Sequence, residues 1–397
     1  MTLALPSNRQ EAWRWSDLSA LPQIAARQPG SLASPLPDLW LDCEVEGPRL
    51  LFVDGKLVAE QSNLGTLEIG ALEAAPVDHP LARLAGREGW KLRLEPGHAP
   101  LGLVQIVHAA TGAADHLAGE IVLGEDAQAS VVETYVGHGW VNRLTHIGLA
   151  RSARLMLSRR ILSDGGYVSL VDEADVSEGA SLTVTTLAAG AADTRLDGRV
   201  RMTGDGAFAE AGGTLLARGR QRHDANLVLR HEQPNGASRQ VWRSVAADKS
   251  TCSVAARVEV ARGAQKTDGE QSLKGLLLAR TATVNAKPEL EIYADDVKCA
   301  HGATVGELNR DALFYLASRG VPEAEAKALL TSAFVADALA PIGEEKVREA
   351  FEADAEAWLI GGKKPLPFRG GVGEGPVSTD TVPPTFPSPV PSPEGEG

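Results

Sequence analysis

The sequence is poor in aromatic residues and in cysteine. Phe, Trp and Tyr make up 5% of its 397 residues, and its three cysteines are Cys43, Cys252 and Cys299. An odd, widely spaced set without a CxxC pair predicts neither a disulfide framework nor a zinc ribbon, and it is typical of a reducing compartment. With 41 glycines, the low aromatic content favours many turns and small packed side chains.

Basic charge and long apolar runs are also scarce. The net charge is −13, which disfavours a nucleic-acid-binding surface because such a surface needs clustered Lys and Arg. No run approaches the ~20 apolar residues of a membrane span, and the N-terminus lacks the pattern of a signal peptide. We therefore expect a cytoplasmic protein that binds neither nucleic acid nor membrane.

Motifs for common enzyme chemistry are missing as well. The chain has no GxxxxGK[ST], no GxSxG and no HExxH, so it predicts neither nucleotide hydrolysis nor zinc-dependent hydrolysis. Acidic residues recur near expected turns, where solvated acids normally lie: Asp172, Glu173, Asp175, Asp193 and Asp197. A carbohydrate-active β-helix enzyme, which needs carboxylates that converge on a groove, stays open as an alternative.

Short runs of alternating apolar residues are present instead, and they predict strands between residues 96 and 306. A small turn dipeptide ending in alanine recurs through this region, at Ala127, Ala153, Ala180, Ala207, Ala237 and Ala264. The intervals are 26, 27, 27, 30 and 27 residues. A near-constant period in a strand-rich region favours a β-solenoid or β-helix, with a set of up-and-down blades as the alternative.

The flanking regions differ from this core. Residues 1–95 are expected to be helical and loop-rich, with a short helix over 11–21 that carries Trp13 and Trp15 against the body, and with a hairpin at Asp54-Gly55. Residues 307–360 predict three amphipathic helices, which could cap the open end of the solenoid or bind a partner. Residues 361–397 are rich in Gly, Pro and Ser, and we expect them to be disordered.

The densest run of suggestive residues is Lys287 to Gly306, KPELEIYADDVKCAHGATVG. Cys299 and His301 are two positions apart, so on a strand they share one face. A thiol and an imidazole suit soft or borderline metals, including iron–sulfur clusters, but two ligands do not complete a site. The plainer interpretation, a buried cysteine beside a satisfied or exposed histidine, stays open.

This run, followed by DALFYLASRGVP and preceded by DGEQSLKGLLLARTATVNA, closely resembles the SufB/SufD family of scaffold subunits in the Suf iron–sulfur cluster assembly machinery. The resemblance covers residues 220 to 340 most strongly. Within the family the chain resembles the SufD branch, because it lacks the Asn-Pro and Glu-His-Glu features of the SufB branch. A primary cluster scaffold of the SufB kind is the alternative.

The resemblance implies a right-handed parallel β-helix flanked by helical regions, and a scaffold that is not itself an enzyme. It implies pairing with SufB through the β-helices, a homodimer when the chain is alone, and docking of the SufC ATPase on the C-terminal helices. There Leu313, Phe314, Tyr315 and Arg319 are the candidate contacts. It further implies that His301, with Cys299 in a less certain role, serves a nascent cluster at the partner interface. Reduced FAD is expected only in the complex.

Overall fold

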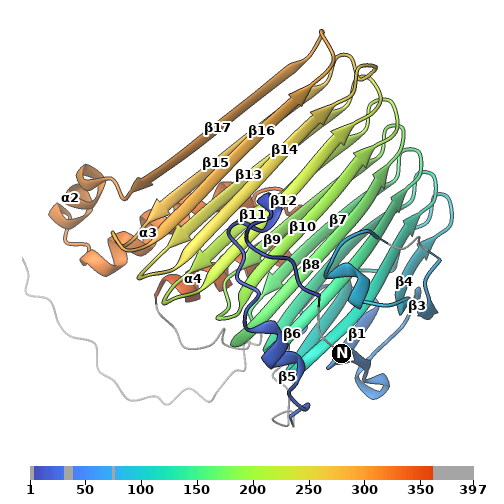
Figure 1. Ribbon diagram of the computed structural model, residues 1–397, viewed down its shortest axis with the longest axis horizontal. Coiled ribbons are helices and arrows are strands. Elements are labelled where there is room, and N and C mark those ends of the chain that lie inside the picture. Colours follow the sequence, from blue (N-terminus) through green and yellow to red (C-terminus); the bar gives the residue numbers. More distant parts are fainter. Residues whose placement is uncertain (1–3, 31–38, 74–76, 361–397) are drawn as a thin grey trace, which may run out of the picture. The chain divides into compact units, whose positions relative to one another are not determined.

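The computed structural model describes residues 4–30, 39–73 and 77–360, so the expected disordered tail at 361–397 lies outside the described residues. Strands dominate the described part of the chain (Figure 1). Their bounds are β1 (Arg49–Val53), β2 (Lys56–Leu57), β3 (Leu67–Ala71), β4 (Glu88–Leu94), β5 (Val104–Leu123), β6 (Gln128–Leu149), β7 (Arg154–Ile161), β8 (Gly165–Val176), β9 (Ser181–Ala188), β10 (Asp193–Met202), β11 (Phe208–Ala217), β12 (Arg222–His231), β13 (Ala237–Ala246), β14 (Thr251–Val260), β15 (Asp268–Leu277), β16 (Thr283–Ile292) and β17 (Lys298–Glu307).

The strands form a parallel β-solenoid with two strands in each turn, which confirms the predicted fold class. One sheet stacks β8, β10, β12, β14 and β16 in parallel register, and the other stacks β7, β9, β11, β13, β15 and β17. The long strands β5 and β6 contribute to both sheets, because β6 pairs with β7 through its first half and with β8 through its second half. Figure 1 shows the strands side by side along the stack.

The alanine repeat marks real corners of the solenoid, and its first four positions are in register with one another. Ala127, Ala153, Ala180 and Ala207 are fully buried and are joined in series by backbone hydrogen bonds from the next turn. The equivalent of Ala207 is then Gly236, because the Ala237 amide donates to the Ala207 carbonyl. The next equivalent is Thr267, because the Asp268 amide donates to the Gly236 carbonyl. The repeat had predicted Ala237 in place of Gly236, and Ala264 in place of Thr267. The period therefore lengthens toward the C-terminal end, to 31 residues between β13 and β15.

The backbone at these corners is left-handed, and glycine is only one of the residues found there. Gly179 and Gly206 do have positive φ, of 60° and 66°, but Asp126, Ser152 and Asn235 adopt the same conformation without being glycine. Asp and Asn tolerate this region better than most residues because their short polar side chains can bond locally. The corner therefore requires a backbone conformation more than a particular residue.

The N-terminal region contains more strand than predicted. Besides a 3₁₀ turn η1 (Glu11–Trp13), the helix α1 (Leu21–Ala25), and 3₁₀ turns η2 (Ala59–Gln61) and η3 (Ala82–Leu84), it supplies β1 to β4. The predicted helix over 11–21 is wrong, although Trp13 is buried as expected and Trp15 is half-buried. The Asp54-Gly55 hairpin is confirmed, because β1 and β2 pair antiparallel around two residues with positive φ.

Three helices follow the last strand, as predicted: α2 (Arg310–Ser318), α3 (Glu323–Leu339) and α4 (Glu345–Leu359). The Asn309 side chain caps α2 by accepting from the Asp311 and Ala312 amides. Leu339 and Phe351 belong to a core with Leu187, Leu216 and Val245, so α3 and α4 pack against the outer face of β9, β11 and β13. The expectation that the helices cap the open end is therefore wrong for α3 and α4.

A helix long and apolar enough to cross a membrane is absent from the described ranges.

Candidate functional site at the last turn of the solenoid

The last two strands are the least covered part of the solenoid. Among the described strands, β16 pairs only with β14, and β17 pairs only with β15, so each has one free edge. Nine of the ten residues of β17 are exposed. Ile292, Tyr293 and Val305 are exposed apolar residues at this end, with Tyr293 at 65%. An unpaired edge with exposed apolar side chains is a surface that can accept another strand.

Cys299 and His301 both lie on β17, as predicted, and they project to the side that faces the solenoid interior. A Cβ placed on Gly269 would lie 3.3 Å from Cys299 Sγ, and Gly269 and Gln271 are the register partners of Cys299 and His301 on β15. Cys299 is half-buried against Val258, Val260, Ala264 and Ala294, and burial raises the pKa of its thiol. His301 is exposed.

These two side chains do not make a complete metal site by themselves. Within residues 4–30, 39–73 and 77–360, no group of three or more His, Cys, Asp or Glu residues could hold a metal ion. Asp295 and Asp296 follow β16 as exposed residues, and the Asp296 amide donates to Gln265 Oε1. A cluster at this position needs donors from outside the described part of the chain.

The other conspicuous residues of this run lie on the opposite face. The alternation expected over Glu289 to Ala294 is only partly present: Leu290 packs inward and Ala294 is buried, but Ile292 is exposed. Lys287, Glu289 and Glu291 form ion pairs on the outward side. Lys287 Nζ lies 3.0 Å from Glu11 Oε1 of the N-terminal segment, and the hydrogen bond to Glu11 raises the pKa of Lys287. Lys287 therefore holds the N-terminal segment at this end of the solenoid, apart from Cys299 and His301.

Three of the predicted docking residues lie on α2, and Arg319 directly follows its last residue. Phe314 is 76% and Tyr315 57% exposed, and the Arg319 guanidinium lies 5.3 Å from the centre of the Tyr315 ring. Leu313 instead lines a groove beside the end of β15 and α3, together with Leu277, Leu308 and Ala328. Leu329 on α3 adds a further exposed apolar side chain.

The structure places a buried charge cluster inside the first turns, which the sequence analysis missed. Glu133 accepts from Arg159 Nε at 2.6 Å, and His108 lies 3.3 Å from the same carboxylate. Arg159 also binds Asp172 at 2.5 Å, and Arg143 joins His108 to Asp115. The Arg159 guanidinium and the His108 hydrogen bond hold the pKa of Glu133 well below its usual value, despite burial.

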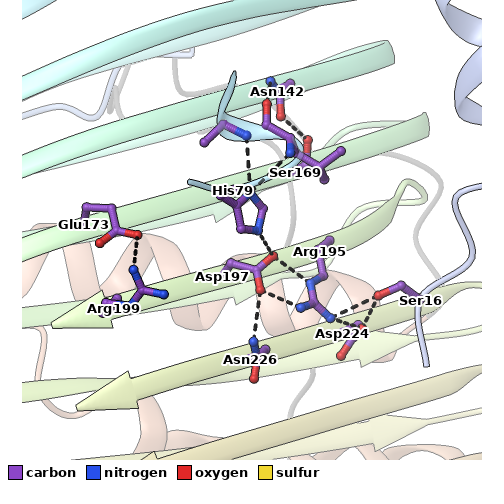
Figure 2. A network of polar contacts seen from close by, with 12 residues as sticks. Ser16, His79, Asn142, Ser169, Glu173, Arg195, Asp197, Arg199, Asp224 and Asn226 are labelled. Atoms are coloured by element: carbon purple, nitrogen blue, oxygen red, sulfur yellow. Dashed lines mark hydrogen bonds and ion pairs between the residues drawn. The ribbon is translucent and has the colours of Figure 1, made fainter. Parts of the chain in front are cut away.

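A second network fastens the N-terminal segment to the outer face of β10 and β12 (Figure 2). Arg195 Nη2 binds Asp197 Oδ1 at 2.5 Å, and Arg195 also binds Asp224, which accepts from the Ser16 hydroxyl. His79 Nε2 lies 3.3 Å from Asp197, and the Arg195 guanidinium lies 4.5 Å from the centre of the Trp13 ring. Every charge in this cluster has an opposite partner.

These contacts correct the expectation that the recurring acids are solvated residues near turns. Asp172 and Asp197 lie within strands and are held by Arg159 and Arg195, and Glu173 lies 3.4 Å from Arg199. Glu173 lines a surface cavity of about 450 Å³ with Glu120, His146, Arg199 and Arg201. Asp172 and Asp197 are thus paired within the solenoid, whereas burial raises the pKa of Glu173 above its ordinary value.

Comparison with known proteins assigns most of the solenoid to one family. The family model "SUF system FeS cluster assembly, SufBD core domain" matches residues 106–334. "Iron-sulfur cluster assembly protein SufD" of Escherichia coli is 26% identical over 384 residues, which cover 91% of this chain and 90% of that protein. Two shorter matches are a SufBD family protein of Synechocystis, 39% identical over 32% of this chain and 28% of that protein, and "Protein ABCI7, chloroplastic" of Arabidopsis thaliana, 29% identical over 58% of this chain and 50% of that protein.

The family match covers the solenoid from β5 to α3 and includes both Cys299 and His301. The chain belongs to the SufBD family of the SUF system, resembles its SufD members, and has a role in iron–sulfur cluster assembly.

Proposed function

We propose that this chain is a non-catalytic scaffold that contributes part of a cluster-building interface and docks an ATPase. One observation carries the proposal: the solenoid ends in two strands with free edges, and the Cys299–His301 pair lies on the more exposed one. A protein that acted alone would be expected to cover such an edge, since an open strand invites pairing.

The partner at this end is a related β-helical chain of the SufB kind. Strand addition satisfies the unpaired backbone groups of β16 and β17, and the exposed Ile292, Tyr293 and Val305 supply apolar contacts. A second copy of this chain offers the same edges, so a homodimer is the expected form when the partner is absent. The SufB-type partner is favoured because a copy of this chain would add only the same two donors.

The substrate held there is iron and sulfide in a nascent cluster. His301 offers an imidazole nitrogen and Cys299 a thiolate, both of which bind iron. The partner must supply the remaining ligands. A primary scaffold of the SufB kind needs more thiols in this chain, yet Cys252 is fully buried with its thiol on the Leu215 and Val245 carbonyls. The reduced flavin expected in the complex stays a prediction.

The ATPase of the SufC kind docks on α2 and the groove beside it. Phe314 and Tyr315 present aromatic surface, and aromatic residues are enriched at the centres of protein interfaces. The groove that Leu313 lines lies between α3 and the end of β15, so a partner bound there touches the solenoid as well as the helices. ATP-driven movement of the helices would then reach the end strands.

Co-purification and reconstitution test the proposal. The full chain, expressed with its partners, is expected to co-purify with an ATPase and a larger related subunit over two successive affinity steps. His301→Ala is expected to keep this complex and to lose the cluster, measured by iron and sulfide content and by visible absorption. His98→Ala, at an exposed histidine far from β17, is the matched control. Full cluster yield from His301→Ala in an intact complex would remove the ligand role.

A further inference from the structure

His301 continues a row of polar side chains inside the solenoid. Gln240 on β13, Gln271 on β15 and His301 on β17 are successive register partners. Gln240 and Gln271 are 0% and 1% exposed, so the row is buried until it reaches His301. Two consecutive buried amides are costly unless each makes its hydrogen bonds.

The hydrogen bonds of the two amides run in one direction along the row. Gln271 Nε2 donates to Gln240 Oε1 at 2.8 Å and to the Ala256 carbonyl at 2.8 Å, and Gln240 Nε2 donates to the Arg257 carbonyl. The carbonyl acceptors on β14 fix which atom of each amide is the nitrogen. Each amide therefore donates toward β14, and Gln240 accepts from its successor in the row.

One acceptor is left over at the end of the row. Gln271 Oε1 is shielded from solvent and has no hydrogen-bond partner among the described residues. Its neighbour on one side, Gln240, already uses its own oxygen to accept from Gln271. The next side chain on the other side is His301, which has a ring N–H to donate. A buried carbonyl without a donor is unfavourable, so a donor from β17 is the natural completion.

We propose that Gln271 is a positioning residue for His301: its Oε1 accepts a ring N–H of the imidazole, which fixes one tautomer and leaves the other nitrogen free to bind iron. Histidine ligands generally donate their second ring N–H to an oxygen, and this contact orients the ring and raises its basicity. This inference rests on the ligand role given to His301 under the proposed function. Gln271 itself does not touch the iron.

The first test reads the His301 tautomer in the isolated full chain, without partner or iron. Long-range ¹H–¹⁵N correlation spectra report which ring nitrogen carries the proton, and the signal of His301 is assigned as the one lost in His301→Gln. In the wild type we expect a single neutral tautomer. Gln271→Met, which is similar in length but has no acceptor, is expected to give a mixture of both. Unfolding midpoints from circular dichroism verify that each variant is folded.

Two further variants separate positioning from a merely structural role. Gln271→Glu keeps an acceptor oxygen at the same position, so it is expected to restore the single tautomer. Gln105→Met removes a buried amide on β5 that bonds Leu41 and does not contact Gln271, so it is expected to leave the His301 spectrum unchanged. A mixed tautomer in the wild type, or an equal effect of Gln105→Met, would overturn the proposal.

The second test uses the complex. Gln271→Met is expected to lower the affinity of the interface for iron about 10- to 100-fold, the usual effect of losing a residue that orients a metal ligand. The two claims fail separately. If His301→Ala keeps its cluster while the tautomer responds as expected, the ligand role fails and the Gln271 contact stands. If the His301 tautomer is the same in Gln271→Met as in the wild type while His301→Ala loses its cluster, the Gln271 contact fails and the ligand role stands.

Discussion

The turn of the solenoid formed by β6, β7 and β8 and the last turn formed by β16 and β17 are built on the same two-strand unit, but they differ in what covers them. The earlier turn has neighbours along both edges, and its inward carboxylates Glu133 and Asp172 are both paired with Arg159. The last turn has a neighbour along one edge only, and its inward donors Cys299 and His301 have no charged partner among the described residues.

This difference shows that the position of a turn in the stack determines whether an inward polar residue is paired within the chain or left open to a partner. A buried charge must be paired, because removing it from water costs several kcal/mol. In the earlier turn the pairs are made within the chain, which leaves nothing to bind. In the last turn the pairing is left open, so the same inward geometry is available to a partner and to iron. Substitutions in the two turns are therefore expected to differ in their effects on stability and on binding.

Removing Arg159 is expected to have the largest effect on stability. Arg159→Met leaves Glu133 and Asp172 buried beside no cation, and breaking a buried ion pair in this way costs about 3–5 kcal/mol. Urea denaturation monitored by circular dichroism measures the loss. The control is Arg201→Met, whose pair with Asp175 is about half exposed, and we expect a loss of about 0–1 kcal/mol there. Similar losses for the two variants would contradict the account.

The C-terminal helices allow a comparison of a packed side chain with a presented one. Phe351→Ala removes a fully buried ring from the interface between α4 and the sheet, and it is expected to lower the free energy of unfolding by about 3–5 kcal/mol. Leu329→Ala removes a side chain that is 55% exposed, so stability should change by about 0.5 kcal/mol or less.

Two exposed side chains of the helices are then tested for binding. Leu329→Ala and Phe314→Ala are each expected to weaken retention of the ATPase in a pull-down from co-expressing cells, although both variants remain folded. If a variant that carries both substitutions retains the ATPase fully, the docking surface does not lie on α2 and α3. Reduced folding of either variant, seen as a lower unfolding midpoint, would show that the exposed side chains pack in solution.

The interior histidines predict how stability depends on pH. Burial lowers the pKa of His108, of His223 and of His231 to about 4 in the folded chain, below the ordinary value near 6.5. The unfolded chain therefore binds more protons between these values, and stability falls as the pH falls from about 6.5 to about 4. His108→Gln should reduce this slope, measured by urea unfolding at several pH values. His98→Gln, at an exposed histidine, should leave it unchanged.

The smallest effect on stability is expected at the proposed functional residue. His301 is exposed on a strand with a free edge, so His301→Ala should change the free energy of unfolding by about 0.5 kcal/mol or less. Urea denaturation of the isolated chain measures this. A loss comparable to that of Arg159→Met would show that His301 is a structural residue of the solenoid.

Much of the fold follows from local patterns in the sequence. Period-two alternation predicts the strands because one face of each is buried, and β7 is an example in which Leu155, Leu157 and Ile161 belong to the core. The alanine repeat predicts the solenoid, yet it loses the register after Ala207. Sequence spacing alone does not show that Gly236 takes the corner position. A Cβ at this position would lie 2.8 Å from Nδ1 of the His231 ring, which is too close.

The site is predictable only in part, for a related reason. The spacing of Cys299 and His301 places them on one face of a strand, but nothing in the spacing says that β17 is the last strand of its sheet. The buried cluster left a signal that the sequence analysis did not use: Glu133 and Arg159 occupy inward positions of their strands between apolar residues. The partners of Gln271 depend on the register of three strands, which local pattern does not determine.

Backbone hydrogen exchange of β17 tests the central claim most directly. In the isolated chain, kept dilute enough to be monomeric, the β17 amides that face the free edge should exchange quickly, while those of β6 to β8 are protected. In the complete complex the β17 and β16 edge amides are expected to become protected, with little change in β6 to β8, because a partner strand takes up the unpaired groups. Unchanged exchange in β16 and β17, with new protection elsewhere on the solenoid, would contradict the account.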